Sequence, residues 1–199
     1  MLILRHGTRA ELVVRKSRFL SEATPVASPE EARAIWRERK STYTNGGHIV
    51  FAFVCGPQGG IMGCFDDGEP SGTAGRPVLE VLKGSGITNV LLTVARWFGG
   101  IKLGTGGLVR AYTESAQLAL ADAPAAELVP TARFTLTLPY GYYENVRHRL
   151  PAYSAEITGE TFSADVILTG TVPRTGFAAL AGMIRDLTGG AVTLCELDE

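Results

Sequence analysis

The sequence predicts an α+β fold in two domains, residues 1–124 and 132–199, joined by a linker over residues 125–131. Three observations lead to this prediction. Strand-type and helix-type apolar patterns are mixed in both halves of the chain. Composition changes over residues 121–130, which are rich in alanine and proline and lack a periodic apolar pattern. Beyond them the patterns follow the order β-α-β-β-α-β, which is the ferredoxin-like motif.

The first elements expected are a strand over residues 11–20 and a helix that ends near Lys40. Ser28 suits the N-cap of this helix and Pro29 its first position. Glu31 stands three residues after Ser28 and completes a capping box. These three signals agree, so the start of the helix is well defined by sequence.

Two β-type runs, residues 48–55 and 61–65, flank a glycine-rich turn and predict a hairpin. If the turn centres on Gln58, residues whose numbers add up to about 116 face each other. His48 would then lie opposite residues 66–68, at the start of the most unusual part of the chain.

The rest of the first half is expected to add two helices and one strand. Pro77 must lie in a first helical turn, and Gly84 suits the C′ position of that helix. Residues 87–95 are almost continuously apolar, which indicates a strand covered on both faces. From Gly106 onward, apolar residues recur at helical spacing.

The second half is expected to contain four strands and two helices. The strands are predicted at residues 132–138, 155–160, 164–172 and 191–197, with helices at residues 141–150 and after Pro173.

Charge and cysteine content limit the classes of function. Net charge is −1, with +3 on residues 1–124 and −4 on the remainder. This asymmetry is too weak for a strongly basic nucleic-acid-binding protein whose affinity comes from many phosphate contacts. The odd number of cysteines has no metal-ligand spacing and fits a reducing cytosol. No run approaches membrane-span length, and the N-terminus does not resemble a secretory signal. We therefore expect a cytoplasmic protein with no membrane partner and no cofactor.

The first candidate binding segment is residues 66–77, with the sequence DDGEPSGTAGRP. Its acids, together with His48, could act in general acid–base chemistry, hold a divalent ion, or only bind a polar partner. A purely structural interpretation also exists, because Asp-Gly and Glu-Pro form turns and acids are favoured before a helix. That interpretation does not explain why Gly72, Gly75 and Arg76 crowd beside the acids, so we favour binding, assign no catalytic residue, and leave a metal open. The candidate residues are Asp66, Asp67, Glu69, Ser71, Thr73 and Arg76.

The second candidate segment is residues 96–110, with the sequence RWFGGIKLGTGGLVR. Cationic side chains beside glycine-rich backbone at a helix start suit a phosphate or carboxylate group. The P-loop sequence is not present. In the alternative interpretation Trp97 and Phe98 are core residues and the glycines permit close packing. The candidate binding residues are Arg96, Gly99, Gly100, Lys102, Gly104, Gly106, Gly107 and Arg110.

A third motif, Arg5-His6-Gly7, has the form of a histidine-phosphatase start. Phosphohistidine chemistry needs a second histidine as partner. The other two are His48, which belongs to the hairpin, and His148, which belongs to the second domain. We interpret the motif as a chance match in an N-terminal strand.

The two glycine-rich motifs, in this order, resemble the IMPACT family in its bacterial, YigZ-type two-domain form. The resemblance extends to residues 16–19, to His48 with residues 52–53, and to the C-terminal half, so it covers nearly the whole chain. Trp97 stands where the family usually has Tyr or Phe. The residues after His48 lack the polar neighbours that the family often has there, which weakens a catalytic role for this histidine.

The resemblance implies a first domain like domain IV of elongation factor G, a ribosomal-protein-type β-α-β sandwich, and a ferredoxin-like second domain like domain V of that factor. It also implies a link to translation regulation and stress responses, because eukaryotic relatives compete for a protein that activates a kinase of an initiation factor. The residues it would place in one cleft are His48, Asp66, Asp67, Glu69, Arg96, Lys102 and Arg110.

Three functions follow as hypotheses. The leading one is a non-enzymatic factor that binds RNA, the ribosome or a translation protein through a mixed-charge, glycine-rich cleft. The second is a metal-assisted enzyme acting on a small phosphorylated or carboxylated metabolite, with the acids of the first segment holding the ion. The third is a protein-interaction module that uses the helix face around Arg33, Arg37 and Arg39. The oligomeric state stays open, and the first two hypotheses require the two glycine-rich segments to fold against each other.

Overall fold

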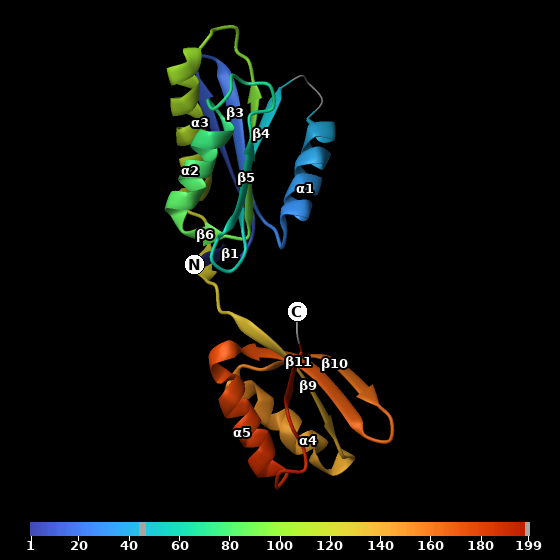
Figure 1. Cartoon of the computed structure of the whole chain (residues 1–199). Coiled ribbons are helices and arrows are strands. Elements are labelled where there is room, and N and C mark those ends of the chain that lie inside the picture. The colour runs from blue at the N-terminus through green and yellow to red at the C-terminus, as the bar shows by residue number, and fades with distance from the viewer. Residues whose placement is uncertain (44–46, 198–199) are drawn as a thin grey trace. The chain divides into compact units, whose positions relative to one another are not determined.

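The computed structural model describes residues 1–43 and 47–197. It divides into two compact units, Met1–Leu128 and Val129–Glu199, and both contain helices and antiparallel sheets (Figure 1). The predicted α+β organisation in two parts is confirmed. The segment expected to be a linker differs in one respect. Its first three residues form strand β8 (Ala125–Glu127), which pairs with β1 (Leu2–Leu4) in the first unit. The first unit therefore extends to Leu128.

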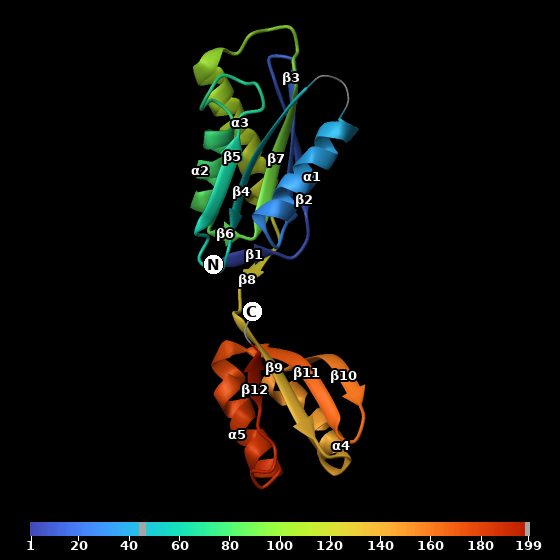
Figure 2. The same ribbon diagram turned by 45° about the vertical axis from the view of Figure 1, so that its right-hand side comes forward.

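The first unit is built on a five-stranded antiparallel sheet with helices on both faces. Helix α1 (Pro29–Thr42) covers one face, and α2 (Gly75–Ser85) and α3 (Gly104–Ala121) cover the other (Figures 1 and 2). The strands, in spatial order, are β2 (Thr8–Val14), β3 (Ser17–Pro25), β7 (Val90–Trp97), β4 (His48–Cys55) and β5 (Ile61–Phe65).

The central strands are apolar on both sides because both faces of the sheet are covered. In β4, Val50, Ala52 and Val54 pack into the core under α2 and α3, whereas Phe51 and Phe53 pack with residues of α1. This alternation places His48 and its neighbour Arg96 on the α2–α3 face.

The expectation of one strand over residues 11–20 is wrong. The segment forms a tight hairpin between β2 and β3, with Arg15 and Lys16 at φ 44° and 65°. A two-residue turn of this kind needs positive φ at both positions, which usually selects Gly or Asn. The chain has neither residue there, so the sequence carries no turn signal, and cross-strand pairing over the full length of β2 imposes the turn instead.

The apolar run at residues 87–95 is also divided in two. Asn89, at φ 53°, separates β6 (Ile87–Thr88) from β7, and β6 leaves the large sheet to form the small sheet β6-β1-β8. Helix α2 ends two residues later than predicted, because Gly86 and not Gly84 adopts the left-handed C-cap conformation, with φ 70°.

The start of α1 follows the predicted capping pattern with one shift. The Ser28 hydroxyl accepts the Glu31 backbone N–H at 3.2 Å. The Glu31 carboxylate accepts the N–H of Ala27 at 2.6 Å, one residue before the N-cap. Both bonds satisfy donors that would otherwise be unpaired at the helix entry.

The second unit has the predicted element order and a four-stranded antiparallel sheet ordered β10-β11-β9-β12. Helices α4 and α5 contribute Val146 and Ile184 to the core against this sheet. The last strand is shorter than expected, because the N–H groups of Ala191 and Val192 bind Thr188 and pairing with the neighbouring strand begins only at Cys195. The elements are β9 (Thr131–Leu138), α4 (Tyr140–Arg149), a 3₁₀ turn (Leu150–Tyr153), β10 (Glu156–Phe162), β11 (Val166–Pro173), a second 3₁₀ turn (Arg174–Gly176), α5 (Phe177–Leu187) and β12 (Cys195–Leu197).

Among the residues described, no helix combines the length and apolar character that crossing a bilayer requires.

Candidate functional site

A buried ion pair joins the two glycine-rich segments. Arg96 Nη1, at the end of β7, lies 2.6 Å from Glu69 Oε1, and the two side chains are 8% and 3% exposed. The hydroxyl of Tyr112, on α3, donates to the same carboxylate oxygen at 2.8 Å. Residues far apart in the chain therefore meet at one point on the α2–α3 face of the sheet.

The pair fixes the arginine in place. A buried carboxylate needs several donors, and Glu69 has the guanidinium and the phenol. Burial, and next the charge of Glu69, raise the pKa of Tyr112 well above its usual range, so the phenol stays a donor. Within the described structure, Arg96 Nε is a buried donor without an acceptor. The guanidinium thus has hydrogen-bonding capacity left over.

A cavity of about 490 Å³ lies beside this pair. His48 reaches it because β4 pairs with β7 so that His48 and Arg96 are direct neighbours. Phe98 is 60% exposed, and its ring lies 5.8 Å from the Arg96 guanidinium carbon. The lining residues are His48, Glu69, Pro70, Arg96, Phe98, Lys102, Leu103, Gly104, Thr105 and Leu108.

The cavity also opens onto the start of α3. The N-cap residue of this helix is Leu103, and in the described structure no side chain caps the helix, so its first N–H groups have no side-chain acceptor there. Lys102 is exposed and forms no ion pair with any carboxylate in the described ranges. A fixed guanidinium, a free ammonium group and a helix N-terminus can together receive an anionic group.

Asp66 has a local structural role. Its carboxylate accepts the backbone N–H groups of Gly72 at 2.8 Å, Ala74 at 3.1 Å and Gly75 at 2.7 Å. These bonds hold the loop that leads into α2 and satisfy donors at the helix start. These structural bonds are therefore sufficient to explain why an acid occupies position 66.

The carboxylate of Asp67 does not share the cavity with Arg96. It accepts the Ile49 N–H at 2.7 Å and forms an ion pair with Lys40 of α1, on the opposite face of the sheet. Only the backbone of Asp67 reaches toward the cavity, where its carbonyl oxygen lies 2.6 Å from His48 Nδ1.

The other candidate residues have separate places. Ser71 and Arg76 are exposed, and the Thr73 hydroxyl donates to the Pro70 carbonyl at 2.6 Å. Arg110 lines a second cavity of about 230 Å³ together with Arg15 and Glu114. The structure therefore brings His48, Glu69, Arg96, Lys102 and Gly104 together, and leaves Asp66, Ser71, Thr73, Arg76 and Arg110 outside this group.

Three glycines of the second segment, Gly99, Gly100 and Gly104, are required by backbone geometry. A Cβ at Gly99 would lie 2.0 Å from the carbonyl carbon of Lys16, so only glycine lets the loop approach the β2–β3 hairpin. Gly100 and Gly104 have φ values of 85° and 71°. Gly106 and Gly107 follow in the first turn of α3.

Comparisons with known proteins identify the family. The model of the Impact N-terminal domain matches residues 15–120, which is more than half of the chain. The chain belongs to the IMPACT family. A second model, a domain of unknown function (DUF1949), matches residues 136–191 in the second unit.

Relatives with the same two-domain extent support this assignment. An IMPACT family member from Haemophilus influenzae is 35% identical over 202 residues, which cover 100% of this chain and 98% of the relative. The IMPACT family member YigZ from Escherichia coli is 31% identical over 94% of this chain and 92% of its own length. A crystal structure described as a hypothetical protein matches with a TM-score of 0.76 and 30% identity, covering 100% of this chain and 97% of that one.

Two residues of this site were not predicted from the sequence as functional: Tyr112, which binds the buried ion pair, and Phe98, which lines the cavity. The sequence places Tyr112 in the helical pattern that begins at Gly106 and suggests Phe98 only as a possible core residue. A tyrosine among alanines at core spacing is itself a signal, because a buried hydroxyl needs a partner. For Phe98 no such signal exists, since exposure of an aromatic residue depends on the fold.

The acids of the IMPACT-family motif do not form a metal site in the described part of the chain. No group of three or more His, Cys, Asp or Glu side chains converges there. Asp66, Asp67 and Glu69 instead bind backbone amides, a lysine and an arginine, respectively. The three carboxylates are therefore each bound to other groups of the protein.

Proposed function

We propose that this IMPACT-family protein is a translation-associated factor that binds RNA through the cavity beside Arg96, Phe98 and Lys102. The link to translation extends what the family resemblance implies for the eukaryotic members. The single observation that carries the proposal is the Arg96 guanidinium, which Glu69 fixes next to the uncapped start of α3. An RNA phosphate placed there would accept from both groups.

An exposed aromatic ring next to this anion site favours a nucleotide over a free anion. Phe98 offers a face on which an unpaired base can stack, and Arg96 lies within cation–π distance of the ring. Sequence-specific RNA recognition targets unpaired bases in single strands and loops. The substrate class we propose is accordingly single-stranded RNA or a loop of a structured RNA.

The charge balance of the chain supports a small number of phosphate contacts. Residues 1–124 carry a net charge of only +3, and the cavity holds two cations, one of them already paired. Binding should therefore depend on position and stacking more than on general electrostatic attraction. A moderate dependence on salt is expected, with a slope that reflects few contacts.

We also propose the finer fold assignment, with domain IV of elongation factor G as the likeness of the first unit and domain V as the likeness of the second. The element order β-α-β-β-α-β and the strand order β10-β11-β9-β12 support a ferredoxin-like second unit. Such an architecture suits a cytoplasmic factor that acts at the ribosome, although a fold alone does not fix a function.

The direct test is fluorescence anisotropy with a labelled single-stranded RNA, together with co-sedimentation with ribosomes. The Phe98→Ala variant should lose about 1–3 kcal/mol of RNA binding, because one stacking contact is removed. The Lys102→Ala variant should reduce the salt slope by about one, because one phosphate contact is lost. Lys83→Ala is the matched control, since Lys83 is an exposed lysine that pairs with Glu80 on α2.

Absence of binding to both RNA and ribosomes, in a folded sample at moderate salt, would overturn the proposal. Equal losses in Lys83→Ala and Lys102→Ala would also count against the cavity, because they would indicate a diffuse charge effect.

A small phosphorylated or carboxylated metabolite is the second candidate, and the cavity volume favours it. About 490 Å³ lies within the range of small-molecule sites. A thermal-shift screen with inorganic phosphate and nucleoside monophosphates, with and without magnesium, distinguishes metabolite binding from RNA binding. Stabilisation by a free nucleotide that Phe98→Ala abolishes, without any RNA binding, would favour this second function.

A further inference from the structure

The outer strand β5 leaves one edge of the large sheet open. No strand lies beyond β5 in the described sheet, and its backbone forms hydrogen bonds only with β4 there. Ile61, Met62 and Phe65 are 54%, 45% and 46% exposed on this strand. Proteins usually protect such an edge with lysine, proline or a bulge, and β5 has none of these. An unprotected apolar edge is a template for another strand.

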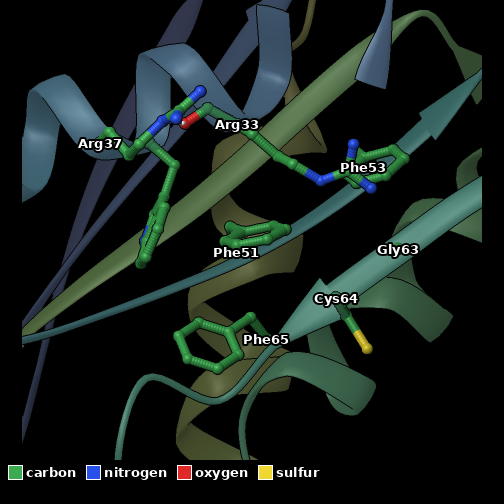
Figure 3. A pocket seen from close by; sticks show the side chains of 8 residues that line it. Arg33, Arg37, Phe51, Phe53, Gly63, Cys64 and Phe65 are labelled. Atoms are coloured by element: carbon green, nitrogen blue, oxygen red, sulfur yellow. Dashed lines mark hydrogen bonds between the residues drawn. The ribbon is translucent and has the colours of Figure 1, made fainter. Parts of the chain in front are cut away.

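A groove of about 410 Å³ runs between this edge and helix α1. Figure 3 shows Phe51, Phe53 and Phe65 on the strands below the helix segment that carries Arg33 and Arg37. The aromatic rings pack against one another, with Phe51 and Phe65 centroids 6.0 Å apart. The groove can therefore receive a bulky apolar side chain.

Gly63, in the middle of the edge strand, allows close packing beside this groove. A Cβ at this position would lie 2.6 Å from two ring carbons of Phe53, so any larger residue would push the ring or the strand away. The glycine thus leaves room for the ring of Phe53, its cross-strand partner, against the backbone of β5.

Cationic side chains flank the open edge on both faces of the sheet. Arg33 and Arg37 border the groove on the α1 side, and Arg76 is exposed at the start of α2 on the other side. No carboxylate in the described ranges forms an ion pair with Arg37 or Arg76. Arg33 has one exposed partner, Glu30, at 3.6 Å. On the α2 side, burial, and next the charges of Asp66 and Glu80, raise the pKa of the Cys64 thiol in β5. Asp66, however, binds backbone amides, and Glu80 pairs with Lys83. The unpaired charges around the edge are therefore positive and favour an acidic occupant.

We infer that β5 and the adjoining groove form a docking site for an extended acidic segment of a partner protein. The segment adds a strand to the open edge and pairs its backbone with that of β5. One bulky apolar side chain enters the groove over Phe51 and Phe65. Flanking Asp or Glu residues contact Arg37 and Arg76. This site lies on the α1 side and at the sheet edge, apart from the RNA cavity on the α2–α3 face, so it does not depend on the function proposed above.

Two other occupants fit the same surface less well. RNA has no backbone N–H and C=O pattern to match a strand edge. Pairing of β5 with β5 of a second copy would bring the unpaired Arg37 and Arg76 of both copies close together, and like charges repel.

Fluorescence anisotropy with a labelled synthetic peptide tests the inference on the full chain. The probe alternates glutamate with valine and has one central phenylalanine. We expect saturable binding that Arg37→Glu weakens by at least about tenfold, since the charge contact becomes repulsive. Arg185→Glu, the same change on an exposed arginine of α5, should leave peptide affinity unchanged. A matched probe with alternate amides N-methylated should not bind, because it cannot form the ladder.

Backbone amide shifts in a ¹H–¹⁵N spectrum should locate the bound probe at β5 and α1. The inference is overturned by absence of binding at about 1 mM probe, a concentration that still detects weak complexes. It is equally overturned by undiminished binding of the N-methylated probe, by shifts confined to the RNA cavity, or by self-association through β5 in sedimentation velocity. RNA binding measured on Arg37→Glu should match the wild type, which separates this test from that of the RNA cavity.

Discussion

At the residue scale, the central feature is the buried ion pair between Glu69 and Arg96. Removing two charges from water is unfavourable, and a buried pair often adds little net stability compared with an apolar pair of equal volume. The arrangement nevertheless holds an arginine at a defined point beside the cavity, with one N–H donor unused. This fixed position of Arg96 is the basis of the binding function proposed above.

Glu69→Gln should destabilise the first unit by about 3–5 kcal/mol, because the Arg96 charge would remain buried without its counter-charge. Urea unfolding followed by circular dichroism measures this change. Glu80→Gln is the matched control, since Glu80 pairs with Lys83 at the surface, and its loss should cost no more than about 1 kcal/mol. Equal effects of the two substitutions would contradict the assignment of Glu69–Arg96 as the buried pair that organises the cavity.

At the scale of elements, the acidic motif divides into parts with different roles. Asp66 organises the start of α2, Asp67 links β4 to α1 through Lys40, and only Glu69 reaches the cavity. Three acids that are close in sequence thus point to three different neighbours. The reason is the loop itself, in which Asp67 and Gly68 adopt φ values of 48° and 87° and reverse the direction of the chain.

Asp66→Ala should lower the stability of the first unit by about 1–2 kcal/mol, the range for loss of a helix-capping side chain, because three backbone N–H groups lose their acceptor. The affinity for RNA, corrected for the folded fraction, should stay unchanged. Thermal unfolding and the anisotropy assay measure the two quantities on the same sample. A loss of RNA affinity without a loss of stability would indicate that Asp66 contributes directly to RNA binding.

The whole molecule contains two separate sets of core residues. The cores of the first unit are centred on residues such as Leu92, whereas Leu168 belongs to the core of the second. No residue is shared between these sets in the described structure. Each unit therefore has the means to hold its own fold.

Leu168→Ala should cost about 2–5 kcal/mol by leaving a cavity in the second core. Hydrogen exchange followed by mass spectrometry should show faster exchange in residues 129–197 and little change in residues 1–43 and 47–128. The matched substitution Leu92→Ala should give the reverse pattern. Faster exchange throughout the chain in either variant would mean that the two cores unfold as one cooperative unit.

Features that depend on local sequence were predicted closely. The limits and the register of the β4–β5 hairpin follow the pattern, with Phe51 opposite Phe65 and Ala52 opposite Cys64. The Ser28 cap of α1 was also predicted, because a cap is formed by residues three positions apart. The Arg15–Lys16 turn was not, because pairing of β2 with β3 imposes positive φ on two residues that carry no turn signal. The break at Asn89 was also not predicted, although Asn adopts positive φ readily, because the apolar residues on both sides suggested one continuous strand.

By itself, the sequence determined the α+β class, the division into two parts, the family and the segment that holds Arg96 and Lys102, because each follows from periodicity, composition or a long motif. Only the tertiary structure decided that Glu69, and not Asp66 or Asp67, meets Arg96, and that β5 is an open edge. The direction of a side chain and the position of a strand in its sheet depend on contacts between residues far apart in the chain, which no local pattern contains.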